Sequence, residues 1–301
     1  MGDSVLATPA GSGSDRRPLR GERVPWRRRW TNWGWTFGMG FALVLSVSVV
    51  GLILYHVLRQ GLAAMNWAFL TQPPPYSYRL TGGGFVNGLI GTAIMVGLAT
   101  LFSAPLGILA AVYLSEYGKQ NAPAQVIRFF SDVMTGVPSI FVGLFIYAAL
   151  VVRFHYGAIM GAAALAIIML PIIVRSAEEM LKLVPPELRD ASYALGAAKW
   201  QTTTRIVLPS ALPGITTGVM LAVARAAGET APLILTVLGA QAITTKLWNQ
   251  PIAALPLQIF AGAQNPFPAG QARAWAGALE LVAIVLVFTL IARLAASRSK
   301  I

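Results

Sequence analysis

Two oppositely charged residues, Arg225 and Glu229, lie inside a long apolar stretch of the sequence. They are four residues apart, so an α-helix would project both side chains from one face, about 6 Å apart along its axis. A charged side chain at membrane depth costs about 3 kcal/mol or more, and such residues usually face a cavity or another subunit on a substrate path. An arginine guanidinium never deprotonates and donates paired hydrogen bonds that suit a tetrahedral oxyanion. We therefore interpret Arg225 as an anion-binding residue, with Glu229 holding it in place or weakening its grip on the anion. The alternative is an ion pair that only locks helix packing.

A second candidate is the stretch 175–208, which is long, charged and bounded on both sides by apolar residues. Pro185 and Pro186 can open a helix from its first turn, and Glu187 would lie near its positive end. The apolar residues that follow share one helix face: Leu188, Ala191, Ala194, Leu195 and Ala198. This spacing predicts a short amphipathic helix over 187–198. Such a helix can lie in a groove of a partner protein, and the alternative is a helix lying on the membrane surface.

The composition indicates that lipid surrounds the elements that carry these residues. Of 301 residues, 56% are hydrophobic and 11% are charged, whereas a soluble domain carries about 25% charged residues. Uncharged runs such as 36–55 and 82–115 are long enough to cross a bilayer, which takes about 20 residues. The chain has no cysteine, which excludes disulfides, thiolate metal sites and cysteine nucleophiles. We expect an all-α integral membrane protein.

Hydropathy predicts six transmembrane helices, at 36–58, 85–113, 129–152, 157–175, 209–238 and 275–294. If the N-terminus is cytoplasmic, 17 Lys and Arg residues fall inside and only five fall outside. That asymmetry satisfies the positive-inside rule and predicts that both termini are cytoplasmic.

The chain divides by composition into three parts. Residues 1–35 are rich in Gly, Ser, Pro and Arg, which predicts a disordered or interfacial basic cytoplasmic tail. Four tryptophans between residues 26 and 35 are interleaved with three consecutive arginines, a pattern suited to the lipid headgroups. The first transmembrane helix, 36–58, and a transmembrane domain over 80–296 follow.

The stretch 175–208 also contains a recognisable motif. Asp190-Ala191-Ser192, three residues, Gly196, nine residues and then 206–209 resembles the coupling-loop signature of ABC importer permeases. That signature normally has Glu-Ala-Ala where this chain has Asp-Ala-Ser. The resemblance implies a type I ABC importer permease fold, in which a coupling loop, here 176–208, docks into a cleft of a cytoplasmic ATPase. The ATPase contacts that it implies are Glu187, Asp190, Ala191, Ser192, Leu195 and Gly196.

Several segments between residue 80 and the C-terminus resemble phosphate importer permeases of the PstA type. They are 82–85 with Gly91-Thr92, Pro105 with 110–117, 137–140 with 143–145, 169–171 with Arg175 and Glu178-Glu179, and 222–232. This resemblance implies a bacterial plasma-membrane importer with a PstC-type permease subunit, a PstB-type ATPase dimer and an extracytoplasmic PstS-type phosphate-binding protein. It also links Arg225 and Glu229 to phosphate passage, and Arg175 more weakly, because positive-inside anchoring explains Arg175 equally well. Permeases for sulfate or molybdate are the nearest alternative.

Other functional classes fit the sequence less well. The net charge of +12 arises from basic residues at the ends of apolar runs, so it predicts topology and no nucleic-acid binding. No catalytic constellation and no Gly-x-x-x-x-Gly-Lys-Ser/Thr loop occurs, so we expect no enzyme and no bound cofactor, with ATP and Mg used by the partner ATPase. A passive scaffold or channel would explain six helices but not the coupling signature.

Overall fold

The computed structural model describes residues 26–118 and 121–298, and its regular elements are helices. By its internal contacts the chain forms two units, residues 1–54 and 55–301. Helix α1 (Trp26–Ala64) begins in the first unit and ends in the second. Part of the expected tail is therefore helical from Trp26 onward, because no proline interrupts the chain between there and the apolar run. The rest of the expected tail, 1–25, lies outside the described residues.

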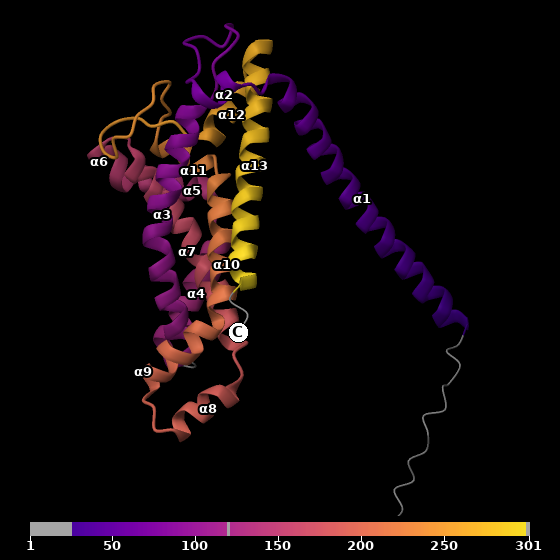
Figure 1. Ribbon diagram of the computed structural model, residues 1–301, viewed down its shortest axis with the longest axis vertical. Helices are drawn as coiled ribbons and strands as arrows, with labels where there is room; N and C mark the ends of the chain where they lie inside the picture. Colours follow the sequence, from indigo (N-terminus) through magenta and orange to yellow (C-terminus); the bar gives the residue numbers. More distant parts are fainter. Residues whose placement is uncertain (1–25, 119–120, 299–301) are drawn as a thin grey trace, which may run out of the picture. The chain divides into compact units, whose positions relative to one another are not determined.

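Four long helices form the second unit and run along its length (Figure 1). They are α3 (Val86–Val112), α7 (Ala158–Lys182), α10 (Leu208–Ala227) and α13 (Pro268–Arg298). Helix α7 packs against α3 over most of its length and also against α10, which packs in turn on α13. The main apolar core forms where α3, α7 and α10 meet, around Met95, Leu165, Met169 and Ala226. The length and apolar character of these helices agree with a membrane-embedded bundle.

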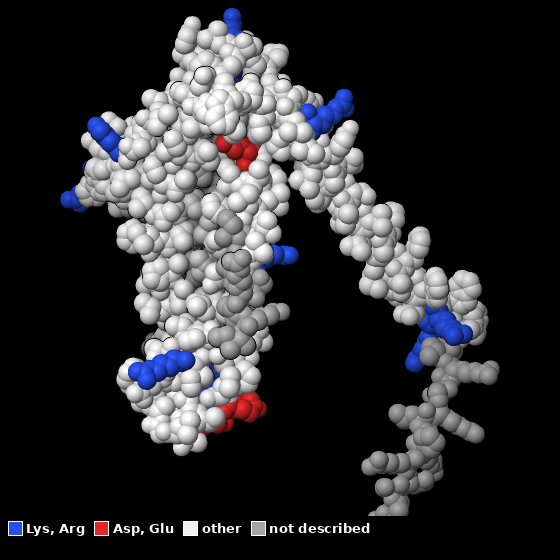
Figure 2. Space-filling view, in the orientation of Figure 1, with Lys and Arg blue, Asp and Glu red and all other residues white. Residues whose placement is uncertain are grey.

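Shorter elements connect the long helices. In chain order they are α2 (Trp67–Thr71), η1 (Tyr113–Tyr117), α4 (Ala122–Gly136), α5 (Ser139–Ile146), η2 (Tyr147–Val151), α6 (Val152–Phe154), α8 (Pro186–Ala194), α9 (Lys199–Thr202), η3 (Thr203–Val207), α11 (Ala231–Thr236) and α12 (Leu255–Ala263), the three η segments being π-helical. Helices α8 and α9 lie at one end of the second unit, and α2 and α12 lie at the other (Figure 1). In the view of Figure 2 the α8 end shows both acidic and basic side chains, whereas the helices above it show few.

The third expected span, 129–152, is broken. Helices α4 and α5 meet at an angle of 106°. Pro138 explains the break, because it has no backbone N–H and forces the preceding residue, Val137, into an extended conformation (ψ 126°). In the described part of the chain, five helices are long and apolar enough to cross a membrane, and six if this bent pair counts as one span. The third expected span therefore consists of two helices joined at a sharp bend.

The fourth and fifth expected spans also differ from the structure. Helix α7 continues to Lys182, seven residues beyond the predicted end, so the expected coupling loop begins inside a helix. Helix α10 ends at Ala227, and α11 starts only at Ala231. Pro232 accounts for this interruption, because its ring would clash with the carbonyl of Gly228 if the helix continued. The expected single helix over 209–238 is wrong.

Close packing of α3 depends on glycines, and two of them give a matched test. A Cβ atom on Gly91 would collide with the carbonyl of Ala253, whereas one on Gly97 would meet nothing within 4 Å. We expect Gly91→Ala to lower the stability of the detergent-solubilised protein by about 1–3 kcal/mol through overpacking. Gly97→Ala should raise it by about 1 kcal/mol through helix propensity. Thermal unfolding of both variants checks this, and equal shifts would contradict the packing.

Candidate functional site

Arg225 and Glu229 form an ion pair although they do not share a continuous helix. The Arg225 Nε atom lies 3.5 Å from Glu229 Oε1. Helix α10 ends between them, but a turn continues the chain, because the Glu229 amide donates to the carbonyl of Ala226 (3.2 Å). The Arg225 side chain is 62% exposed and that of Glu229 is 15% exposed. The guanidinium therefore has donors free to bind another group, while the carboxylate that holds it is mostly buried.

The packing of α10 on α7 places Arg225 near the middle of the bundle. Helix α7 ends and α10 begins at the α8 end, so the two helices are antiparallel. A Cβ atom on Gly218 would collide with the Ser176 side chain, which fixes the register of the two helices. Arg225 lies seven residues after Gly218 on α10, and Met169 lies seven residues before Ser176 on the antiparallel α7. The two residues are therefore level, and Met169 shares an apolar cluster with Ala226. Met169 is about 16 Å from one end of α7 and about 20 Å from the other, at 1.5 Å per residue.

Arg175, the weaker candidate, lies elsewhere. Its Nη1 atom is 3.1 Å from Asp132 Oδ1 on α4, and its Nε atom is 3.7 Å from Glu179 Oε1. It is six residues beyond Met169 on α7, which puts it about 9 Å closer to the α8 end than Arg225. The structure therefore pairs Arg175 with two carboxylates of its own neighbourhood and does not bring it to the Arg225–Glu229 pair.

Most of the expected ATPase contacts are on the surface of the loop between α7 and α10. Five of the six are exposed: Glu187, Asp190, Ala191, Leu195 and Gly196. The amphipathic helix exists but is shorter than predicted, since α8 ends at Ala194. Gly196 follows with φ 81°, a conformation that favours glycine and turns the chain out of the helix. Ala198, expected on the same helical face, lies outside α8.

Ser192 is the exception among the six. It is 4% exposed, and its hydroxyl lies 2.9 Å from that of Thr202 on α9. The side chain thus fixes α8 to α9 within the loop and is turned away from the exposed surface.

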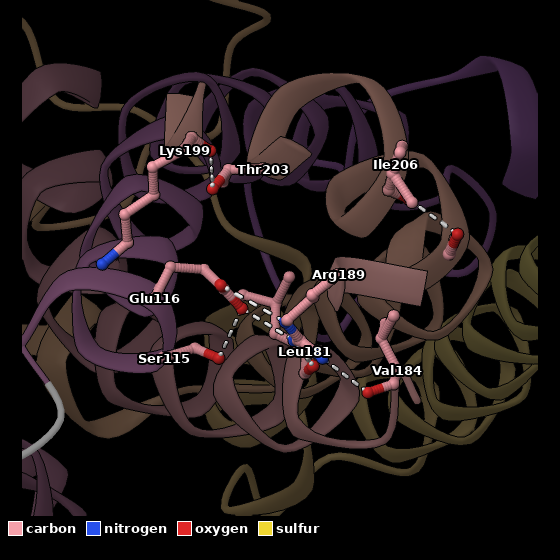
Figure 3. A network of polar contacts seen from close by, with 9 residues as sticks. Ser115, Glu116, Leu181, Val184, Arg189, Lys199, Thr203 and Ile206 are labelled. Atoms are coloured by element: carbon pink, nitrogen blue, oxygen red, sulfur yellow. Dashed lines mark hydrogen bonds and ion pairs between the residues drawn. The ribbon is translucent and has the colours of Figure 1, made fainter. Parts of the chain in front are cut away.

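Arg189 and Glu116 form a buried charge pair that the sequence reasoning did not identify (Figure 3). Arg189 Nη2 donates to Glu116 Oε1 at 2.7 Å, and Arg189 Nε donates to Oε2 at 3.4 Å. Arg189 also donates to the carbonyls of Leu181 (3.0 Å) and Val184 (2.6 Å). The sequence contains one indication that Glu116 is unusual: it is the only acidic residue between positions 23 and 131.

A second buried carboxylate joins α4 to α7. Glu178 is 2% exposed, and its Oε1 atom accepts from Arg128 Nε at 2.9 Å and lies 2.7 Å from Lys182 Nζ. Arg128 also donates to the carbonyl of Leu114 (2.9 Å). Two cations around one buried carboxylate compensate its charge, so removing either cation would be costly once the helices have packed. No cluster of three or more metal-ligating side chains occurs among the residues that the structure describes.

Comparison with known proteins identifies relatives along almost the whole chain. Residues 103–301 match the family described as binding-protein-dependent transport system inner membrane component. The phosphate transport system permease protein PstA of Yersinia pestis is 40% identical over 291 residues, which cover 93% of this chain and 95% of that protein. The corresponding protein of Haemophilus influenzae is 42% identical over 243 residues, covering 80% and 85%.

Solved structures share the fold at low sequence identity. A bacterial alginate ABC transporter, in complex with an alginate-bound periplasmic protein, contains a chain with TM-score 0.65 at 15% identity, covering 92% of this chain and 98% of that one. A second structure of a bacterial alginate importer gives TM-score 0.62 at 17% identity, covering 91% and 100%. The helical bundle is therefore an arrangement that type I ABC importer permeases use.

Proposed function

Since this chain belongs to the binding-protein-dependent transport permeases, and among them to the PstA-type subunits of phosphate ABC importers, we propose that Arg225 lies on its phosphate path. The chain is a multi-pass permease subunit of a membrane transporter and is not itself an enzyme. The names of its relatives favour phosphate over sulfate or molybdate.

One observation supports this assignment above the others. Arg225 is 62% exposed on this chain although it lies level with the middle of α7. A charge at that depth needs water, a counter-ion or another subunit, since hydrocarbon would not solvate it. Arg225 thus fits the wall of a path that a second permease subunit completes. Its planar fork suits two oxygens of phosphate, and Glu229 competes with the anion for the same guanidinium.

The mechanism that we propose is alternating access between a site open to the outside and one open to the cytoplasm. A PstS-type protein delivers phosphate, a PstC-type subunit forms the other half of the path, and a PstB-type ATPase dimer uses ATP and Mg. Closure of the ATPase dimer pulls on α8 and reorients the helices around Arg225. The exposed contacts on α8 and the surplus of basic residues near it support a cytoplasmic location for this end and for both termini.

Reconstitution tests this proposal. Proteoliposomes containing this chain, a PstC-type subunit, a PstB-type ATPase and a loaded phosphate-binding protein should take up radiolabelled phosphate only when ATP is present on the ATPase side. Omission of any one component should abolish uptake, and excess sulfate or molybdate should leave it unchanged. Uptake without the ATPase, or equal uptake of sulfate, would contradict the proposal.

The carboxylate of Glu229 gives a separate prediction about release. Glu229→Gln removes the negative charge that competes with phosphate for Arg225, so the anion should dissociate more slowly. We expect the maximal uptake rate to fall about tenfold, which corresponds to about 1.4 kcal/mol, while ATPase association is retained. Rates measured at saturating loaded binding protein check this.

The matched control is Glu280→Gln, which replaces a buried carboxyl group of α13 instead. It should transport at the rate of the unmodified chain. Unchanged uptake in the Glu229→Gln variant would assign that pair to helix packing.

A further inference from the structure

The loop that carries α8 is connected to three helices. Two of these connections run through the backbone, and the third runs through side chains only. The chain runs directly from α7 into α8, and from α9 through η3 into α10. Helix α3 has no such connection, although it is the principal packing partner of α7. A movement of the loop therefore reaches α7 and α10 along the backbone, but it reaches the end of α3 only through side chains.

We propose that Arg189 and Glu116 are positioning residues that form a permanent joint, through which movement of α8 is transmitted to α3. The inference rests on the proposed function, in which α8 is the element that the ATPase moves. Glu116 lies on η1, the π-helical continuation of α3, and Arg189 lies in the middle of α8. The two atoms that bond them are 2.7 Å apart (Figure 3).

The burial of the joint indicates that it stays closed through the transport cycle. The Glu116 side chain is 5% exposed and the Arg189 side chain is 16% exposed. Opening the pair would leave two charges in a poorly solvated place, which is far less favourable than breaking an exposed pair. Arg189 is also held by the carbonyls of Leu181 and Val184, so the same guanidinium binds the end of α7 and the end of α3.

Neighbouring contacts support the same joint. The Lys199 ammonium of α9 lies 4.8 Å from the centre of the Tyr117 ring, which is the residue after Glu116. The Ser192 hydroxyl fixes α8 to α9 through Thr202. Two of the three bundle helices that meet the loop, α3 and α10, wind as π-helices there, at η1 and η3, and π-helical turns occur frequently at functional sites. The loop thus forms one body with the end of α3, and its exposed face is left for the ATPase.

The experiment compares coupling in the complete reconstituted importer. The variants are Glu116→Gln, Arg189→Gln and the double variant, and the control is Arg293→Gln, which removes an exposed arginine of α13, outside the loop. Three quantities are measured: co-purification of the ATPase, ATP hydrolysis, and phosphate taken up per ATP hydrolysed. The last quantity is the one that a purely structural role would not change.

We expect each single variant to keep the ATPase bound and to hydrolyse ATP, while phosphate uptake per ATP falls roughly tenfold, within the range of typical coupling energies. The double variant should be no worse than either single one, because residues that act as a unit are not additive. Arg293→Gln should transport normally. Unchanged uptake per ATP in both single variants would overturn the joint. Loss of ATPase binding would also overturn it, because the pair would then be part of the docking surface. Failure of the unmodified chain to bind the ATPase would instead refute the proposed function.

Because the chain has no cysteine, a covalent substitute for the joint can be tested without background. Glu116→Cys with Arg189→Cys should be uncoupled like the double glutamine variant. A reversible dithiol-reactive cross-linker of matching length should restore uptake per ATP, and reduction should remove it again. A cross-linked importer that binds ATPase but still fails to transport would show that the pair must open, and would overturn the permanent joint.

Discussion

Replacing Arg225 with alanine is expected to reduce ATP-driven phosphate uptake about a hundredfold or more, with membrane insertion and ATPase association intact. The side chain is a cation that the structure exposes at the middle of the bundle, 3.5 Å from its carboxylate partner. Loss of two charge-assisted hydrogen bonds removes about 3 kcal/mol or more of interaction with the anion, which accounts for the size of the effect. Radiolabelled phosphate uptake in cells, normalised to the amount of assembled importer, is the measurement.

Lysine at the same position separates charge from geometry. Arg225→Lys keeps the positive charge but loses the planar fork, so we expect uptake about tenfold below that of the unmodified chain and above that of the alanine variant. Arg175→Ala provides the comparison within the same bundle, because Arg175 is held by Asp132 and Glu179. Normal uptake by Arg225→Ala with assembly intact would return the pair to a packing role and remove it from the phosphate path.

The sequence predicted the spans well where one helix crosses without interruption. Helix α13 contains its expected span and α3 matches its own to within one residue at each end, because long apolar runs leave the chain few alternatives in lipid. Hydropathy alone could not predict where those runs bend. The break at Pro138 and the gap before Pro232 lie inside apolar stretches, and they follow from backbone chemistry that a hydropathy average does not register.

The residues of the candidate site also differ in whether the surrounding sequence could reveal them. Arg225 and Glu229 could be found because both residues lie within one short segment, and the motif at Asp190 could be found for the same reason. The pairing of Arg189 with Glu116 spans 73 positions, and nothing in the local pattern of either segment indicates it. Ser192 shows the converse, since the motif placed it among contact residues whereas packing turned it inward onto Thr202.

Replacing Leu195 with aspartate is expected to abolish co-purification of the ATPase and to reduce phosphate uptake about a hundredfold, as for a central contact residue worth 2 kcal/mol or more. Leu195 is 89% exposed, just beyond the end of α8. It borders an open hollow of about 530 Å³ that Leu188 and Ala191 also line. An exposed leucine beside an apolar hollow fits a surface that a partner covers, because the exposure of apolar surface to water is unfavourable.

Leu183→Asp is the matched control for that prediction, because Leu183 is 72% exposed in the same segment but lies outside the hollow. It introduces the same charge twelve positions away, so a general effect of charge on insertion or folding would appear in both variants. If only Leu195→Asp loses the ATPase, the apolar tip of α8 is buried against that partner. If Leu195→Asp keeps the ATPase bound, the ATPase docks through other residues of the loop, and the apolar side of α8 is left to face the membrane surface. The two variants together therefore distinguish the two surfaces that an amphipathic helix can cover, a distinction that amphipathicity alone does not make.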